Sequence, residues 1–386
     1  MIMLTLEKNN NELKLDDFMN MASSETGLSD WGEKDFIPSL ECLINSFYSQ
    51  EQELARHIFF RNECLRLLKN RLYIQHNLAK YPQIKKRTIQ KPIFIIGLGR
   101  TGSTLLHNLL SLSPVFRTLK YWELLYPSPV DIYLTDNDNR IIVTQKQIKA
   151  MYRRFPELLN KHELQAERPE ECCLLMMHTF LSRHFYISWN VPAYADWLNQ
   201  QDLKNTYQYY KDLLCLLTHK EEPLNLVLKD PMHLPSLNHL LSSFPDARFI
   251  WTHRDPATVI SSYYSLSKSI KGSLSKKEMI LGIEQLAKDT RDADIVRHKN
   301  NESKFFDVPY NDLVFKTEDV IKNIFRFLEV EYDDHLIEKI TQWKAENRQD
   351  KFGRHHHTLD SLGLNQDQIY QIFSYYHEKY SALYSI

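Results

Sequence analysis

The chain has 386 residues, of which 43% are hydrophobic and 25% charged, a composition that fits a globular protein with a full core. Its 48 basic and 49 acidic residues leave a net charge of −1, so charge gives no indication of nucleic acid or an anionic membrane as a partner. No apolar run reaches the roughly 20 residues of a membrane helix, and the polar start of the chain does not resemble a signal peptide. Five cysteines without regular spacing favour reduced thiols, and we therefore expect a cytoplasmic protein.

The first 90 residues are predicted to form a helical segment. Residues 1–20 look frayed, whereas apolar side chains recur with helical spacing from Phe36 to about Leu78. We expect residues 1–90 to pack on a single α/β domain of residues 91–386, as a cover or as the surface of a homodimer.

A glycine-rich turn follows, and the rest of the chain is organised around it. The apolar run from Ile93 to Ile96 is typical of a strand buried on both faces of a parallel sheet. Three of the nine glycines, Gly97, Gly99 and Gly102, come directly after it, and leucines at helical spacing begin just after Ser103. Strand, glycine turn and helix start together predict a phosphate cradle, in which backbone N–H groups and the helix dipole face one anion.

The turn differs from the Walker A loop of nucleoside triphosphatases in the position of its cation. Gly97 and Gly102 have the Walker spacing, but Ser103 stands where that motif requires Lys. Arg100 lies inside the turn instead and is followed by hydroxyl side chains. The pattern favours an anion with fewer phosphates and no obligatory magnesium. A structural turn that contains an Arg by chance is the alternative interpretation.

The next segment is interpreted as a Pro-rich turn, between Thr118 and Pro129, and then as a mostly helical insertion of about residues 141–220. Helical patterns cover Glu163 to Phe180 and Thr206 to Thr218, with an aromatic stretch between them. An insertion of this kind forms either a lid over an acceptor site or an ordinary helical layer, and the sequence leaves both open.

Further strands are predicted in the second half of the chain, at Asn225–Lys229, Arg248–Thr252 and Phe305–Val308. A helical pattern follows each of them. The alternation of strands with helices predicts an α/β fold whose central parallel sheet is flanked by helices on both sides.

The turn also carries a family resemblance. The run Gly99-Arg-Thr-Gly-Ser-Thr-Leu-Leu106 resembles the 5′-phosphosulfate loop of sulfotransferases that use 3′-phosphoadenosine-5′-phosphosulfate (PAPS). It is most similar to the bacterial-type branch that also resembles tyrosylprotein sulfotransferases. The resemblance implies a P-loop-like three-layer fold and transfer of sulfonate from PAPS, without a metal, to a hydroxyl or amine. The acceptor would be a small molecule or a peptide.

The resemblance assigns roles to residues of the turn. Arg100 matches the family's loop cation and would stabilise charge on the bridging oxygen of the leaving 5′-phosphate. The residues that would bind the 5′-phosphate are Gly99, Arg100, Thr101, Gly102, Ser103 and Thr104.

A second anion site is expected for the 3′-phosphate. Arg254 ends a predicted strand and Ser262 lies about two helical turns later, so both can face the carboxyl edge of the sheet. Their interval matches the family's 3′-phosphate motif. The cytosolic enzymes hold the same phosphate with a late Arg-Lys-Gly loop, to which Gly353-Arg354 corresponds here in a different order.

The acceptor hydroxyl needs a base. By resemblance to the tyrosylprotein enzymes that base is Glu123, which lies a little past the cradle helix. The rivals are His107, His233, Glu170 and Glu171. Lys229 belongs to a Lys-Asp-Pro element that the same enzymes share, and it would bind the sulfonate in the transition state. An ion pair with Asp230 or Asp255 is the alternative for Lys229.

Two other functions are weighed against sulfonate transfer. A P-loop small-molecule kinase is disfavoured because Ser103 replaces the Walker Lys. A nucleotide-binding scaffold without catalysis would need the turn, Arg254 and Ser262 to persist without an acceptor site. The contiguous histidines 355–357 lack an accompanying carboxylate pattern, so we expect a solvated loop there and no metal.

Overall fold

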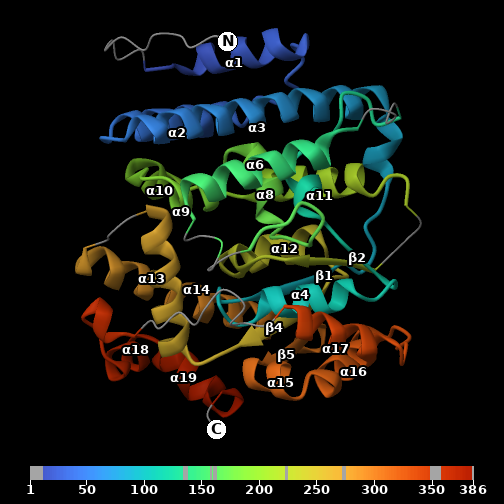
Figure 1. The fold of residues 1–386 in the computed structure, drawn as a ribbon, viewed down its shortest axis with the longest axis vertical. Coiled ribbons are helices and arrows are strands. Elements are labelled where there is room, and N and C mark those ends of the chain that lie inside the picture. The colour runs from blue at the N-terminus through green and yellow to red at the C-terminus, as the bar shows by residue number, and fades with distance from the viewer. Residues whose placement is uncertain are drawn as a thin grey trace.

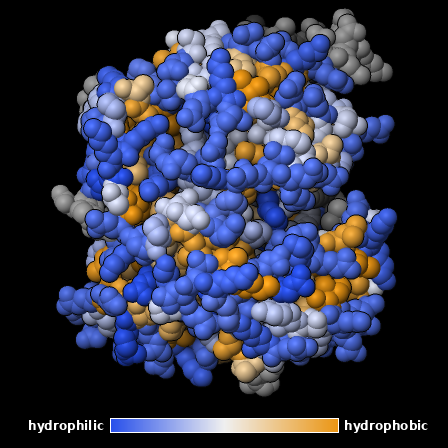
Figure 2. All heavy atoms as spheres, turned by 180° about the vertical axis from the view of Figure 1, so that it is seen from behind, coloured by the Kyte–Doolittle hydropathy of each residue, from blue (hydrophilic) through white to orange (hydrophobic). Residues whose placement is uncertain are grey.

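The structure is a computed structural model that describes residues 12–384 except 134–137, 157–158, 160–162, 222–224, 272–274 and 348–357. Figure 1 shows a sheet between layers of helices, with the N-terminal helices at the top of the view and the C-terminal helices at the bottom. The reverse face is hydrophilic over most of its area, with scattered apolar patches, and is hollowed between its upper and lower halves (Figure 2). None of the helices in the described ranges combines the length and the apolar composition that a bilayer crossing needs.

Parallel strands form one sheet in the order β2-β3-β1-β4-β5. The strands are β1 (Ile93–Gly97), β2 (Phe116–Thr118), β3 (Asn225–Lys229), β4 (Arg248–His253) and β5 (Phe305–Pro309). The central strand β1 pairs Ile95 with Lys229 of β3 and Gly97 with Thr252 of β4. Because all the strands run the same way, their carboxyl ends meet at one edge of the sheet.

Alternate residues of β1 face two hydrophobic cores. Phe94 and Ile96 pack in the core shared with the N-terminal helices and the insertion. Ile93 and Ile95 pack in the other core, with side chains of the helices that follow β1 and β5. A central strand covered on both faces must be apolar throughout, which explains the continuous run in the sequence.

Helices surround the sheet on both faces (Figure 1). The N-terminal ones are α1 (Leu15–Thr26), α2 (Ile37–Tyr48), α3 (Leu54–Lys80) and the 3-10 turn η1 (Pro82–Lys86). Helix α4 (Ser103–Ser111) joins β1 to β2. Between β2 and β3 lie α5 (Tyr121–Leu125), α6 (Arg140–Arg154), α8 (Cys173–Met176), η2 (Met177–Thr179), α9 (His184–Ser188), α10 (Pro192–Leu198) and α11 (Lys204–Leu217).

The later helices follow their strands in order. After β3 come η3 (Pro231–Ser236) and α12 (Leu237–Ser243), and after β4 come α13 (Pro256–Lys271), α14 (Lys276–Asn300) and η4 (Glu302–Lys304). After β5 come α15 (Tyr310–Phe315), α16 (Thr317–Leu328), α17 (Leu336–Glu346), η5 (Asp360–Leu362), α18 (Gln366–Ile372), α19 (Ser374–Tyr380) and η6 (Ser381–Leu383).

The predicted fold class, a parallel α/β sheet with helices on both sides, is confirmed. One strand was not predicted, and one local expectation is wrong. The sequence before the Pro-rich turn contains the edge strand β2, whose three residues are too few to show a pattern. Residues 15–20, expected to fray, belong to α1, because Phe18 and Ala22 are buried in the main core. The division into residues 1–90 and 91–386 stays a prediction.

The insertion is helical, as expected, but its helices are shorter and more numerous than the sequence indicates. The pattern read as one helix from Glu163 to Phe180 contains only the short α8 and η2. The aromatic stretch after it, read as a break, forms α9 and α10, because Phe185 and Tyr194 are buried in the main core.

Candidate active site

The carboxyl edge of the sheet collects the segments that leave β1, β3, β4 and β5. From β1 the chain crosses through α4 to β2 on one side, whereas β4 lies on the other side, so the strand order reverses at β1. In open α/β sheets a reversal of this kind opens a crevice at the carboxyl edge, where ligands bind. The candidate site is built there.

The turn after β1 has the backbone of a cradle. Gly97 has a φ of 131°, and a Cβ there would lie 2.6 Å from the carbonyl oxygen of Thr252 in β4. Gly102, at the start of α4, has a φ of 90°, and its Cβ would lie 2.9 Å from the ring of Tyr310. Arg100 also has a left-handed backbone, with a φ of 72°. That conformation costs a residue with a Cβ on the order of 1–2 kcal/mol, and such strain gathers at functional sites.

Open space and unused N–H groups complete the cradle. A Cβ on Gly99 would meet nothing within 4 Å, so a ligand has room to approach the backbone at that point. The Thr101 hydroxyl donates to the carbonyl of Leu98 at 2.6 Å and lies 2.6 Å from the hydroxyl of Thr252, which fixes the loop. Helix α4 begins at Ser103 with no side-chain cap, so its first N–H groups are free to bind an anion.

Arg100, Arg254 and Ser262 meet beside this cradle. Arg100 Nε donates to Ser262 Oγ at 3.0 Å, and an Arg254 N–H donates to the carbonyl oxygen of Arg100 at 3.0 Å. The Arg254 guanidinium also stacks 3.9 Å from the centre of the Tyr310 ring. Burial lowers the pKa of the Arg100 guanidinium, and the neighbouring Arg254 cation lowers it further. No carboxylate among the described residues hydrogen-bonds to either guanidinium, so the pair suits an anion such as phosphate.

Lys229 links the cradle to a pair of carboxylates. Its fully buried side chain donates from Nζ to Thr104 Oγ1 at 3.3 Å and to Glu171 Oε1 at 2.9 Å, and Nζ lies 3.6 Å from Glu170 Oε1. Burial by itself would lower the pKa of the Lys229 ammonium, but the two carboxylates outweigh it and raise that pKa above its usual value. The Glu171 side chain is 31% exposed and the Glu170 side chain only 9%, so Glu171 is the more accessible base.

Asp230 follows Lys229 in the chain and is fully buried. Its Oδ1 accepts from the backbone N–H of Met232 at 2.8 Å, whereas its Oδ2 has no hydrogen-bond partner among the described atoms. Burial, reinforced by the Glu171 carboxylate, raises the pKa of Asp230 to about 7. Side chains with metal-ligand chemistry, with ligand atoms within 4.8 Å of one another, are Cys172, Asp230 and His233, and also Glu171, Cys173 and Asp230. The expected absence of a metal therefore stays a prediction.

Glu123, the base expected by resemblance, occupies a different environment. Its carboxylate accepts from the backbone N–H of Lys120 at 2.7 Å and from Arg117 at 3.0 Å, and Arg117 also pairs with Glu221. Glu123 is only 7% exposed. Within the described ranges, no hydrogen bond or ion pair joins it to the cradle or to Lys229. These contacts fit a residue that holds the start of α5 against β2.

The remaining candidates lie elsewhere. His233 is fully buried, with Nδ1 at 2.9 Å from the Tyr207 hydroxyl and Nε2 at 3.2 Å from Cys172 Sγ, and burial lowers its pKa to about 3. Burial likewise lowers the pKa of His107, in α4, to about 3. Both imidazoles are therefore buried and only weakly basic, which does not suit a general base. Arg354 and the three histidines after it lie outside the described residues.

Sequence reasoning named Glu171 only as a rival base and did not single out Tyr310. Tyr310 directly follows β5 at the same edge as Arg254, so its position after a strand was the available signal. Glu171 reaches the edge because the backbone N–H of Cys172 donates to the Lys229 carbonyl at 3.1 Å. This contact ties the insertion to the end of β3, and nothing in the sequence pattern indicates it.

Together, the parallel sheet, the cradle and the clustered cations define a site suited to a nucleotide-like anion. Comparison with known proteins identifies the class. A model of the sulfotransferase family matches residues 92–334, and the chain belongs to that family. The omega-hydroxy-beta-dihydromenaquinone-9 sulfotransferase Stf3 of Mycobacterium bovis is 24% identical over 311 residues, 74% of each chain, and the Mycobacterium tuberculosis protein of that name matches equally.

Solved structures agree on the fold. Sulfotransferase STF1 from Mycobacterium tuberculosis superposes with a TM-score of 0.81 and 24% identity, covering 95% of this chain and 100% of its own. Sulfotransferase STF9 from Mycobacterium avium superposes with a TM-score of 0.83 and 23% identity, covering 97% and 98%. The fold is therefore the P-loop-like sulfotransferase fold, and the protein is a sulfotransferase. Family membership implies PAPS as the co-substrate. The comparisons favour neither the kinase nor the scaffold.

Proposed function

We propose that this edge of the sheet transfers the sulfonate of PAPS to an acceptor hydroxyl, with Glu171 as the general base in place of Glu123. One observation carries the proposal: Lys229 contacts both Thr104 of the cradle and the Glu171 carboxylate. The donor side and the acceptor side of the reaction are thereby separated by a single ammonium group.

The donor side fits a nucleotide with two phosphate groups. The 5′-phosphate would take the open space at Gly99, the uncapped N–H groups of α4 and the Arg100 guanidinium. The 3′-phosphate would take Arg254 and Ser262. The contact between Arg100 and Ser262 supports two neighbouring anion sites, as one nucleotide requires.

PAPS supplies a sulfonate carried on its 5′-phosphate. As the acceptor oxygen bonds to sulfur, the sulfur–oxygen bond to that phosphate breaks and the phosphate keeps the electron pair. Arg100 stabilises this charge, Lys229 stabilises the sulfonate oxygens, and Glu171 accepts the hydroxyl proton. Sulfuryl transfer in this scheme needs positioning and charge stabilisation more than covalent help.

A hydroxyl acceptor is supported by the printed name of the Stf3 relative, which describes an omega-hydroxy substrate. We propose further that Lys229 supplies the cationic charge a metal would otherwise provide, so turnover should resist chelators. The cytoplasmic location and the homodimer stay predictions.

The test compares one substitution at two carboxylates. Glu171→Gln keeps the size of the side chain but cannot take a proton, so transfer to a panel of alcohols and phenols should fall about 10²–10⁴-fold. Transfer is followed with labelled sulfonate donor, and binding of adenosine 3′,5′-bisphosphate by calorimetry should hardly change.

Glu123→Gln is the matched control. It removes an ion pair with Arg117, so it should lower the melting temperature but leave turnover per folded molecule within a few-fold of the parent. If Glu171→Gln kept wild-type turnover and Glu123→Gln lost it, the general base would be Glu123.

A further inference from the structure

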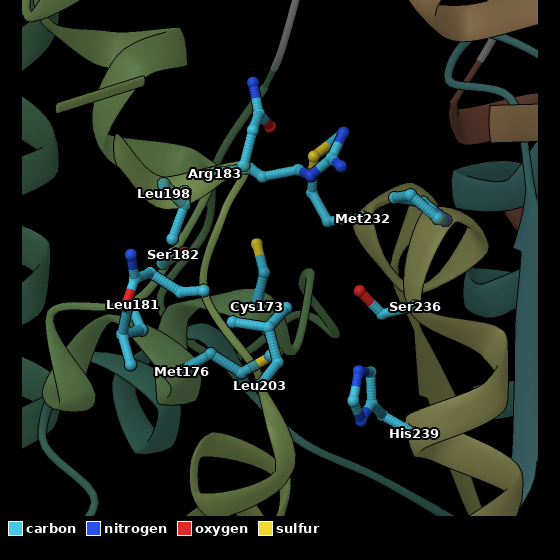
Figure 3. A pocket seen from close by; sticks show the side chains of 13 residues that line it. Cys173, Met176, Leu181, Ser182, Arg183, Leu198, Leu203, Met232, Ser236 and His239 are labelled. Carbon is cyan, nitrogen blue, oxygen red and sulfur yellow. The ribbon is translucent and has the colours of Figure 1, made fainter. Parts of the chain in front are cut away.

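A pocket of about 160 Å³ opens between the insertion and the segment that follows β3. Its apolar walls are Cys173 and Met176 of α8, Leu198 of α10, Leu203 just before α11, and Met232 of η3. Figure 3 shows these side chains around one space, with the sulfur of Cys173 on one wall and Met232 on the facing one.

The pocket adjoins the proposed base. A carboxylate oxygen of Glu171, the sulfur of Cys173 and an oxygen of Asp230 all lie within 4.8 Å of one another. Cys173 also lines the pocket, and so does Met232, whose backbone N–H holds Asp230. Cys173 therefore connects the pocket wall to Glu171, and Glu171 contacts Lys229 at the cradle.

The charged groups of the pocket are already paired. Arg183, which reaches over it in Figure 3, donates to Asp289 at 2.8 Å. His239 at the other end lies 3.7 Å from Asp202. The pocket thus presents thioether and leucine side chains together with the uncharged polar side chains of Ser182, Asn199, Gln201 and Ser236, and flexible thioethers adapt to groups of varied shape.

Size narrows the ligand further, because an apolar cavity of about 150 Å³ is large enough to hold one benzene ring. We infer that this pocket is the acceptor subsite and that it takes an uncharged, ring-sized group whose hydroxyl faces Glu171. The inference rests on the proposed function, because it makes Glu171 the base.

The test uses benzyl alcohol, which carries a ring, and ethanol, which does not. Burial of a ring predicts that kcat/KM for benzyl alcohol exceeds that for ethanol by about 10- to 100-fold. Leu203→Trp fills the pocket from its half-exposed rim and should narrow this ratio to within about threefold. Leu281→Trp, at an exposed position of α14, is the matched control and should leave the ratio unchanged.

A binding measurement separates this inference from the proposed function. Saturation-transfer NMR should detect benzyl alcohol on the wild-type protein with adenosine 3′,5′-bisphosphate present, and the signal should be lost in Leu203→Trp. An unchanged ratio and signal in a folded Leu203→Trp, or in the milder Leu203→Phe if Trp prevents folding, would overturn the subsite. If both alcohols fail as acceptors while the NMR signal behaves as expected, the pocket stands as a binding site and the transfer assignment fails.

Discussion

Two of the regions that pair a glutamate with a cation, at β2 and at the end of β3, differ in which partner is accessible. At β2, Arg117 pairs with Glu123 and Glu221, and both Arg117 and Glu123 are largely buried. At the end of β3, the cation Lys229 is fully buried, whereas the Glu171 side chain keeps 31% exposure. In the first pair, Arg117 and Glu123, both side chains are largely buried against each other. In the second pair, Lys229 is buried but the Glu171 carboxylate stays partly exposed beside the cradle.

The contrast extends to unpaired charge. Arg117 has carboxylates on two sides, but Arg100 and Arg254 lie together with no carboxylate hydrogen-bonded to either within the described ranges. Cations held close against their mutual repulsion favour an anionic ligand that neutralises them. Positive charge without a hydrogen-bonded carboxylate therefore fits the proposed donor site in a chain whose net charge is only −1.

The strongest test of this contrast removes the cation from each pair. Lys229→Ala leaves two carboxylates without their ammonium, so it should cost about 3–5 kcal/mol of unfolding free energy and lower transfer by about 10²–10³-fold. Arg117→Ala should destabilise the protein to a similar degree, because it leaves Glu123 buried and unpaired, yet change turnover per folded molecule little. Urea unfolding and donor turnover measure the two effects, and equal losses of turnover would erase the distinction between the regions.

A second test addresses the unpaired cations. Charge-assisted hydrogen bonds contribute ~1.5–3 kcal/mol, so Arg254→Ala should weaken adenosine 3′,5′-bisphosphate by about 10- to 100-fold. Adenosine 5′-phosphate, which lacks the 3′-phosphate, should lose less than about threefold. Arg248→Ala, at the other end of the same strand, is the matched control for calorimetry. If Arg254→Ala weakened the binding of both nucleotides equally, Arg254 would not be the residue that binds the 3′-phosphate.

The smallest effect concerns Asp230, whose pKa is raised to about 7 by burial and by Glu171. A raised carboxyl pKa stabilises the folded state below the unfolded pKa, near 4, and that stability is lost as pH rises through the folded pKa. Asp230→Asn cannot titrate, so the wild type should lose about 1 kcal/mol relative to it between pH 6 and pH 7. Urea unfolding at each pH measures the difference, and parallel stability curves would show that Asp230 is already ionised.

Much of the fold could be predicted from the sequence because its signals are local. The apolar strand of β1 and the glycines after it are contiguous, and β3, β4 and β5 alternate with helices at recognisable spacing. Strand β2 was not predicted from the sequence because three residues at a sheet edge show no periodicity. Helices α9 and α10 were not predicted because their aromatic side chains are buried by tertiary packing and do not form a regular apolar stripe in the sequence.

The residues proposed to bind the donor could also be predicted, because their sequence signals are local. Arg100 stands inside the turn itself, Arg254 directly follows β4, and Ser262 lies on the next helix, α13. The proposed base could not be predicted, because Glu171 lies 58 positions before Lys229 in the sequence and reaches it only through a backbone contact of the insertion with β3. A carboxylate that lies nearer the turn in sequence, Glu123, therefore looked like the better candidate.

The order of the strands has a consequence for biosynthesis. Strand β1 is made early, but the strands on either side of it are β3 and β4, and the nearer of these begins roughly 130 residues later. At about 5–20 residues per second, a ribosome leaves this apolar strand without a neighbour for roughly 7–26 s. During that interval Phe94 and its neighbours are exposed on the nascent chain. The centre of the finished enzyme is thus an aggregation-prone segment of the nascent chain, and a chaperone that binds apolar extended peptides would protect it.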